Sequence, residues 1–181
     1  MKKLILLTIC ISFTASVMGQ EIFKIQEYTV EQKHSNMLNS YWSHLAAGIS
    51  FAKTHNVSPY EYGTFHGKIF AELRASNRAS SADEASFKNF AQANLNSCSR
   101  FITESRSKII IELESDSLLV FKVPSSVFLL DYFGTEGRFG VTAEELLEMI
   151  NGSHEQISKD YGCTSEMVLE GDWIVMTIKK E

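Results

Sequence analysis

The side chains of this sequence that could bind a metal ion or exchange a proton near neutral pH are its five histidines: His34, His44, His55, His66 and His154. Three of them, His44, His55 and His66, are spaced eleven residues apart. On a single helix, His44 and His55 would share a face but lie about 16 Å apart along the axis. A Zn–N bond is only about 2.1 Å long, so this pair cannot share one ion. The sequence predicts neither a metal site nor a cofactor.

Two of the histidines lie on apolar faces of predicted helices. His66 stands between Tyr62 and Ile69, and His154 stands between two isoleucines of its own helix. A histidine in such a position is usually packed in a core and hydrogen-bonded, which is the first interpretation here. The alternative is that His66 or His154 serves as the general base of a small hydrolase, because an imidazole titrates near neutral pH. No G-x-S-x-G, CxxC or H-E-x-x-H pattern accompanies them.

Aromatic residues are concentrated between positions 41 and 70, where they recur at helical spacing. Aromatics at this spacing commonly form a core, but an excess on two adjacent helix faces could line an apolar pocket. In such a pocket Tyr62 and His66 would be the polar groups that orient a ligand, with Trp42 and His44 beside them. The leading functional hypothesis is therefore a binding or accessory module for a small apolar or amphipathic ligand.

Two glycine-containing stretches resemble anion-binding loops. Residues 134–140 carry three glycines and Arg138 before a helix expected to begin at Thr142, and a guanidinium can hold a carboxylate with two hydrogen bonds. Glutamates in this loop and in the first helical turn would repel an anion, so an ordinary connector is the alternative. Gly63 and Gly67 precede a lysine, but their spacing is one residue short of a phosphate loop and they lie inside a predicted helix. No nucleotide site is predicted.

Three helices are expected to position these residues. Apolar residues at helical spacing predict a helix over 29–55, and a capping box at Ser58 predicts the start of a second. The short turn between them predicts an antiparallel helical hairpin. After a loop expected over 75–81, a third helix is predicted to be capped by Ser81.

The second half of the chain is predicted to form two hairpins around one more helix. Three consecutive isoleucines from 109 to 111 predict a strand covered on both faces, and the apolar run 127–133 is too short to assign. The predicted elements are strands over 108–114 and 118–123, a helix over 142–161, and strands over 164–169 and 173–179. The fold class is α+β: three N-terminal helices, then a β-hairpin, a helix and a β-hairpin, with helices packed on an antiparallel sheet.

The first nineteen residues predict an export signal. Lys2 and Lys3 precede an apolar run over 4–13, and small residues follow up to Gly19. Ten apolar residues make only about 15 Å of helix, half of a bilayer core, so a cleavable signal fits better than a membrane anchor. We expect a signal peptide over 1–19 and a single domain over 20–181, periplasmic or secreted and not inserted in a membrane.

Signal cleavage would leave two cysteines, Cys98 and Cys163. In an oxidising compartment they could form a disulfide, which would stabilise the fold by about 4 kcal/mol in the chain-entropy model. The alternative is two separate buried thiols, because Cys98 lies on an apolar helix face.

The overall composition limits the functional classes. The chain has 181 residues, 44% of them hydrophobic and 22% charged, with a net charge of −5. This composition excludes a disordered or low-complexity protein, and the acidic balance argues against a nucleic-acid partner. A protein–protein adaptor without a small ligand is the remaining alternative, and no feature of the sequence identifies its partner.

Overall fold

The computed structural model describes residues 27–78, 86–102, 109–126, 131–134 and 136–181. Residues 34–181 form one compact unit and residues 1–33 a second, of which 27–33 are described. The elements are α2 (Val30–Thr54), α3 (Pro59–Arg78), α4 (Phe87–Phe101), β1 (Ile110–Glu114), β2 (Leu118–Pro124), α5 (Asp131–Phe133), α6 (Ala143–Lys159), β3 (Cys163–Glu170) and β4 (Trp173–Lys180). None of the helices in these ranges has the length and apolar character that crossing a bilayer requires.

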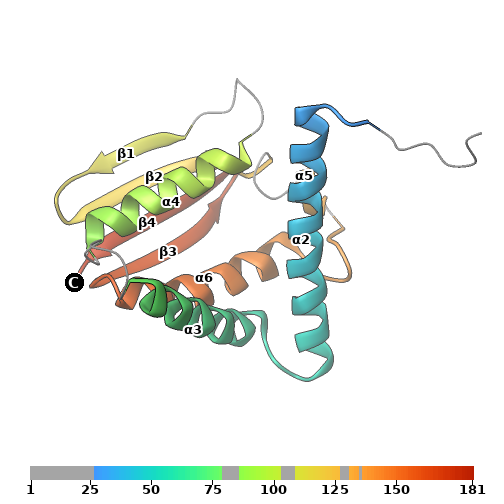
Figure 1. Cartoon of the computed structure of the whole chain (residues 1–181), viewed down its shortest axis with the longest axis horizontal. Coiled ribbons are helices and arrows are strands. Elements are labelled where there is room, and N and C mark those ends of the chain that lie inside the picture. The colour runs from blue at the N-terminus through green and yellow to red at the C-terminus, as the bar shows by residue number, and fades with distance from the viewer. Residues whose placement is uncertain (1–26, 79–85, 103–108, 127–130, 135) are drawn as a thin grey trace, which may run out of the picture. The chain divides into compact units, whose positions relative to one another are not determined.

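The strands form one antiparallel sheet in the order β1-β2-β4-β3 (Figure 1). The two predicted hairpins are present, and β2 joins them by pairing with β4, where Phe121 faces Met176. Side chains of β2 alternate between buried and half-buried, because one face of the sheet packs against helices. The α+β fold class is confirmed.

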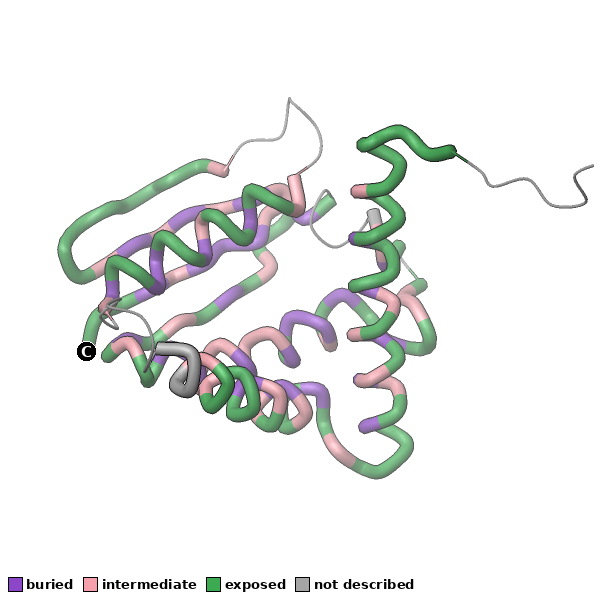
Figure 2. Tube along the Cα trace, in the orientation of Figure 1, coloured by how far each residue is buried: buried purple, intermediate pink, exposed green. Residues whose placement is uncertain are grey.

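The helices pack on the sheet and on one another. α4 packs over the sheet, α6 runs along β3, and α3 lies against α6 in the most extensive helix–helix contact of the unit (Figure 1). Buried residues follow the central strands and the inner sides of α4 and α6 (Figure 2). The largest fully buried side chains include Trp42 of α2, Phe121 of β2 and Leu146 of α6, so one core joins helices and sheet.

The predicted helix signals are present where the structure describes them. The Ser58 and Glu61 side chains each accept a hydrogen bond from the other residue's backbone N–H, which is the capping box that begins α3. Thr142 and Glu145 form the same arrangement at the start of α6. Asn56 has φ = 59° just after α2 ends, a left-handed conformation that asparagine tolerates better than most residues.

Three expectations about the helices need correction. The loop expected over 75–81 is wrong for its first part, since α3 continues to Arg78. α4 begins at Phe87 with Ser86 as its N-cap, and the expected cap Ser81 lies outside the described residues. The antiparallel α2–α3 hairpin is also wrong, because α3 packs mainly against α6 and meets α2 only locally, where Tyr62 lies against Gly48. Glycines on α3 and α6 allow these two helices to approach closely.

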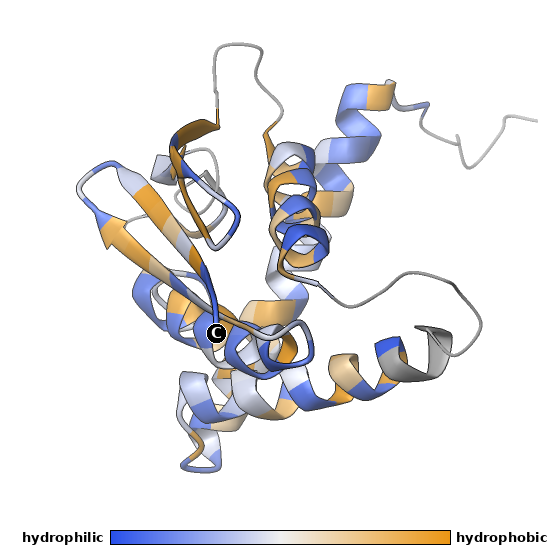
Figure 3. Cartoon of the chain, turned by 90° about the vertical axis from the view of Figure 1, so that its left-hand side faces the viewer, coloured by the Kyte–Doolittle hydropathy of each residue, from blue (hydrophilic) through white to orange (hydrophobic). Residues whose placement is uncertain are grey.

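The strand β1 was expected to be covered on both faces, and this is wrong. All five of its residues are exposed, including Ile111 at 47% and Leu113 at 49%. β1 is an edge strand whose register shifts between these two residues: Ile111 pairs with the buried Phe121, whereas Leu113 pairs with Val120 on the other face of β2. Its hydrophobic residues can be followed in Figure 3.

The apolar run 127–133, which could not be assigned from sequence, includes the short helix α5 at its end. Residues 127–130 lie outside the described residues. Phe133 is buried against Trp42, so α5 closes the core beside α2.

Candidate functional site

α3 and α6 approach so closely that glycine is required at the points of contact. At three positions a Cβ atom would collide with the backbone of the other helix, and only glycine lacks that atom. The distances from the built Cβ to a backbone oxygen are 1.9 Å from Gly63 to Met149, 2.4 Å from Gly67 to Ser153 and 2.2 Å from Gly152 to Tyr60. The contact is therefore formed mainly by backbone against backbone.

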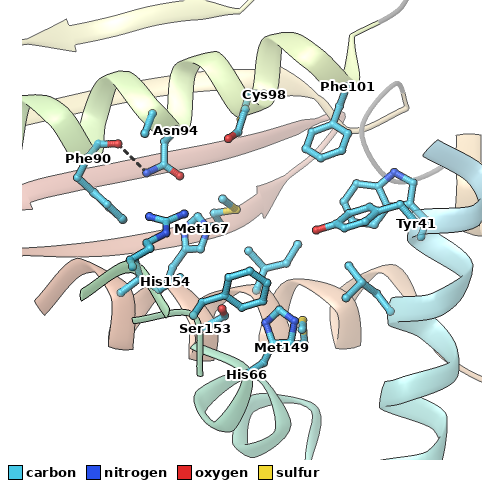
Figure 4. Close-up of a pocket in the computed structure, with 18 residues that line it drawn as sticks. Tyr41, His66, Phe90, Asn94, Cys98, Phe101, Met149, Ser153, His154 and Met167 are labelled. Carbon is cyan, nitrogen blue, oxygen red and sulfur yellow. Dashed lines mark hydrogen bonds between the residues drawn. The ribbon is translucent and has the colours of Figure 1, made fainter. Parts of the chain in front are cut away.

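A cavity of about 220 Å³ lies beside this contact, within residues 34–181 (Figure 4). Its wall is mostly apolar and contains one cation and no carboxylate among the described lining residues. α2, α3, α4, α6 and β3 all contribute to it. The lining residues are Tyr41, Trp42, Leu45, His66, Phe70, Arg74, Phe90, Ala93, Asn94, Ser97, Cys98, Phe101, Met149, Ile150, Ser153, His154, Ile157 and Met167.

Helical periodicity explains why these side chains converge. His66, Phe70 and Arg74 follow one another at intervals of four residues, so they share one face of α3. On α6, Ser153 and His154 stand beside Gly152, so the same turn that contacts α3 also faces the cavity. The close glycine contact and the cavity wall are thus two faces of the same pair of helices.

The strand side of the wall is fixed by one asparagine. The Asn151 Nδ2 donates to the Met167 carbonyl oxygen at 2.8 Å, and the Met167 N–H donates to the Asn151 Oδ1 at 2.8 Å. This pair of hydrogen bonds holds α6 to the edge strand β3. It also fixes the Met167 backbone, whose side chain closes the cavity from the sheet.

One end of the cavity is aromatic. The Trp42 and Phe101 ring centroids lie 5.1 Å apart, and the Tyr41 ring stacks on Phe101 at 5.9 Å. Trp42 is buried, whereas Tyr41 is exposed at the mouth. This end joins α2 to the last turn of α4.

The opposite end is polar, and Figure 4 shows Phe90, Asn94 and His154 there. The Asn94 Nδ2 donates to the Phe90 carbonyl oxygen at 2.9 Å, which fixes the side-chain amide. The His154 ring meets Phe90 edge-on, with centroids 6.1 Å apart. Arg74 of α3 lies close enough to His154 to affect its protonation.

Burial favours the neutral form of both cavity histidines. Burial lowers the pKa of His154 to about 4, and the neighbouring Arg74 guanidinium lowers it further in the same direction. Burial also lowers the pKa of His66. The Nδ1 atoms of both rings are buried and have no hydrogen-bond partner among the described residues. A neutral imidazole offers one N–H donor and one acceptor nitrogen, so both rings have capacity for a ligand.

The titration of these groups suits binding better than acid–base chemistry. A general base is most effective when its pKa lies near the working pH, and His154 lies far below neutrality. Burial raises the pKa of the Cys98 thiol to about 12, so this cysteine carries almost no thiolate, the form that attacks substrates. The cavity therefore holds neutral polar groups in an apolar wall.

Of the five residues that the sequence suggested for ligand binding, two line the cavity and three lie outside its lining. Trp42 and His66 line the cavity. Tyr62 packs against α2, where a Cβ on Gly48 would lie 2.4 Å from the Tyr62 hydroxyl oxygen. His44 is exposed, with its Nδ1 at 2.7 Å from the Ser40 carbonyl oxygen. These last two side chains are not among the lining residues.

Arg138, the fifth residue, is also outside the cavity lining. Its guanidinium donates to the Asn39 side-chain oxygen, and its backbone pairs with Val141. At the start of α6, Thr142 and Glu145 already satisfy one another's backbone N–H groups, and Lys53 pairs with Glu145. The glycine-rich loop thus makes the contacts of a connector docked on α2.

Cys98 and Cys163 are free thiols in the structure, and both are buried. The disulfide considered from the sequence is not formed, and the alternative of two separate thiols holds. Cys98 lines the cavity, whereas the Cys163 thiol donates to the Ser158 carbonyl oxygen at 3.4 Å.

Sequence reasoning missed Arg74 and Asn94 of the cavity wall. Arg74 could have been recognised from its position, because it lies eight residues after His66 on the same helix face. Gly63 and Gly67 resemble part of a phosphate loop, but their spacing of four residues also places them on one face of α3. The adaptor alternative predicts an exposed apolar patch, and α3 does expose Phe65 and Leu73 on its outer side.

In the described part of the chain, no three His, Cys, Asp or Glu side chains are grouped so that they could hold a metal ion. No protein-family model matches the sequence, and no curated protein matches it.

Among solved structures, the Fe(II) unliganded H-NOX protein from K. algicida is similar at 15% identity and a TM-score of 0.36, covering 88% of this chain and 77% of that one. A mutant of the same H-NOX protein is similar at 13% identity and a TM-score of 0.34, with the same coverage. Similarity at this level carries no conclusion about function.

Proposed function

We propose that the protein binds a small, largely apolar molecule in the cavity between α2, α3, α4, α6 and β3. The observation that carries this proposal is an apolar cavity whose wall contains two buried imidazole nitrogens without partners among the described residues. A buried polar atom that lacks a partner costs about 1–3 kcal/mol, which a hydrogen bond from a ligand would offset. Such a site combines apolar burial with a few orienting polar groups.

The size of the cavity limits the ligand. Sites for drug-sized molecules measure about 300–1,000 Å³. The cavity here measures about 220 Å³, so its ligand is smaller, comparable to one or two rings or a short acyl chain.

The test is binding of 1-naphthylamine, a neutral two-ring fluorophore whose emission changes in an apolar site. Ser97 is exposed at the edge of the cavity, so Ser97→Phe should obstruct it without disturbing the core. Ser99 is exposed on the same helix but does not line the cavity, so Ser99→Phe is the matched control.

We expect saturable binding to the wild type and to Ser99→Phe, and affinity at least about tenfold weaker for Ser97→Phe. Equal binding to all three proteins would place the fluorophore elsewhere and contradict the proposal. Native mass spectrometry of the purified protein would add the mass of any ligand retained from the host.

We also propose that the protein acts outside the cytoplasm, since residues 1–19 have the pattern of a cleavable export signal. The measurement is N-terminal sequencing of protein recovered from the periplasm or the medium of an exporting host. A mature chain beginning at Gln20 is expected, and full-length protein confined to the cytoplasm would contradict the proposal.

A further inference from the structure

The charges of the cavity wall indicate what kind of small molecule would occupy it. We infer that the ligand is an amphipathic anion, a small carboxylate whose charged group pairs with Arg74 and whose apolar end lies toward Trp42 and Phe101. This inference rests on the proposed function and names the ligand class for the same cavity.

Arg74 is the first part of the argument. It is the one charged side chain among the described residues that line the cavity, and no carboxylate lies among them. Its side chain is half-buried, and none of the ion pairs within the described residues includes it. A partly buried cation without a partner is costly, and a carboxylate is the group that a guanidinium binds with two parallel hydrogen bonds.

The second part is the polarity of the cavity along α4. Phe90, beside His154, and Phe101, beside Trp42, are eleven residues apart on this helix, which places them about 16 Å apart along its axis. Arg74 belongs to the Phe90 end, since it lies near His154. The cation and the aromatic rings therefore occupy opposite ends of one cavity, the arrangement that an amphipathic molecule matches.

The third part is the set of neutral groups beside Arg74. The His154 imidazole carries no charge at pH 7, so Arg74 provides the positive charge of this end. The imidazole can still donate one N–H, and a carboxylate has more acceptor positions than one guanidinium fills. Arg74 and His154 together can thus bind a carboxylate, whereas an ammonium group would meet no opposite charge.

The experiment compares octanoate with 1-octanol, which have the same chain length and differ in charge. Binding is measured by calorimetry and by the emission of Trp42 in a Trp173→Phe background, since the chain has two tryptophans. The variants are Arg74→Gln, which removes the charge, and Arg74→Lys, which keeps it without the planar fork. Arg100→Gln is the control, because Arg100 is exposed on α4 and does not line the cavity.

We expect octanoate to bind wild type and Arg100→Gln at least about tenfold more tightly than 1-octanol does, with Arg74→Gln abolishing this difference and Arg74→Lys keeping part of it. If both molecules bind equally and Arg74→Gln changes neither, the anion inference is overturned while the binding function stands. If neither molecule perturbs Trp42 or releases heat, and the neutral fluorophore also fails to bind, the proposed function itself is overturned.

Discussion

α3 has two inner sides that pack in opposite ways. Toward α6 it presents Gly63 and Gly67, and the two backbones lie in direct contact. Toward α4 it presents His66, Phe70 and Arg74, and between the two helices a cavity remains. The same twenty-residue helix thus forms both a direct backbone contact with α6 and one wall of the cavity.

This difference shows how a small domain can keep a cavity open. Between Pro59 and Arg74, only Pro59, Gly63 and Gly67 of α3 are buried, so no large side chain of this part of the helix is fully buried. α3 is held by close contact at its glycines and does not need to pack its larger side chains against α4. The side chains of α3 that face α4 therefore line the cavity.

The largest expected effect comes from placing a methyl group in the tight contact. Gly63→Ala should lower the free energy of unfolding by at least about 2 kcal/mol, measured by urea denaturation. Alanine is the better helix former by about 1 kcal/mol, but a Cβ at 1.9 Å from the Met149 oxygen forces the helices apart. Gly48→Ala is the control, because its Cβ would meet the Tyr62 hydroxyl, the end of a side chain that can move. Equal losses in both variants would contradict the glycine contact.

The second effect concerns the cavity wall and depends on pH. In the unfolded chain His154 takes up a proton as the pH falls below about 6.5, whereas burial holds its pKa at about 4 in the folded state. The unfolded state binds more protons in this window, so stability is lost as the pH falls from about 6.5 to 4, by up to about 3 kcal/mol.

His154→Gln should reduce this loss, because a glutamine does not titrate. The measurement is urea denaturation of both proteins at pH 7 and pH 4.5. His44→Gln is the control, since His44 is exposed and lies outside the cavity. An unchanged pH dependence in His154→Gln would show that His154 is not held neutral by its surroundings.

The smallest effect lies at the rim of the tight contact. The Tyr60 hydroxyl donates to the Glu155 carboxylate, which links α3 to α6 and raises the pKa of Tyr60. Tyr60 is 41% exposed, so Tyr60→Phe should cost only about 0.5–1 kcal/mol in urea denaturation. Lys159→Met removes the other partner of Glu155 without crossing between the helices, and it should cost less. A loss for Tyr60→Phe as large as that for Gly63→Ala would mean that the side-chain bond, and not the backbone contact, holds the helices together.

Most of the fold could be predicted from local signals. The bounds of α2 and α6 and both hairpins follow from periodicity, from the capping box at Thr142 and from turn residues, all of which act within a few positions along the chain. The partner of α3 could not be predicted in this way, because Gly63 meets Met149 from a distant part of the sequence. The exposure of β1 was missed for the same reason, since its apolar residues do not reveal that it is an edge strand.

The candidate site could be predicted only in part. Aromatic density indicated Trp42, and an apolar helix face indicated His66, because both signals are local. A cavity, however, is a volume that several elements leave unfilled, and it depends on how all of them cross. Arg74 enters the site only because α3 turns this face toward α4, which no pattern within α3 reveals.

The backbone contact between α3 and α6 also has a consequence for temperature. Attraction that comes from removing apolar surface from water weakens on cooling, as it must in the core between α4 and the sheet. Dispersion between two closely packed backbones has no such dependence. Near the freezing point the α3–α6 pair should therefore be the part of the fold that loosens last. The cavity should then keep the wall formed by α3 and α6 when the wall formed by α4 begins to loosen.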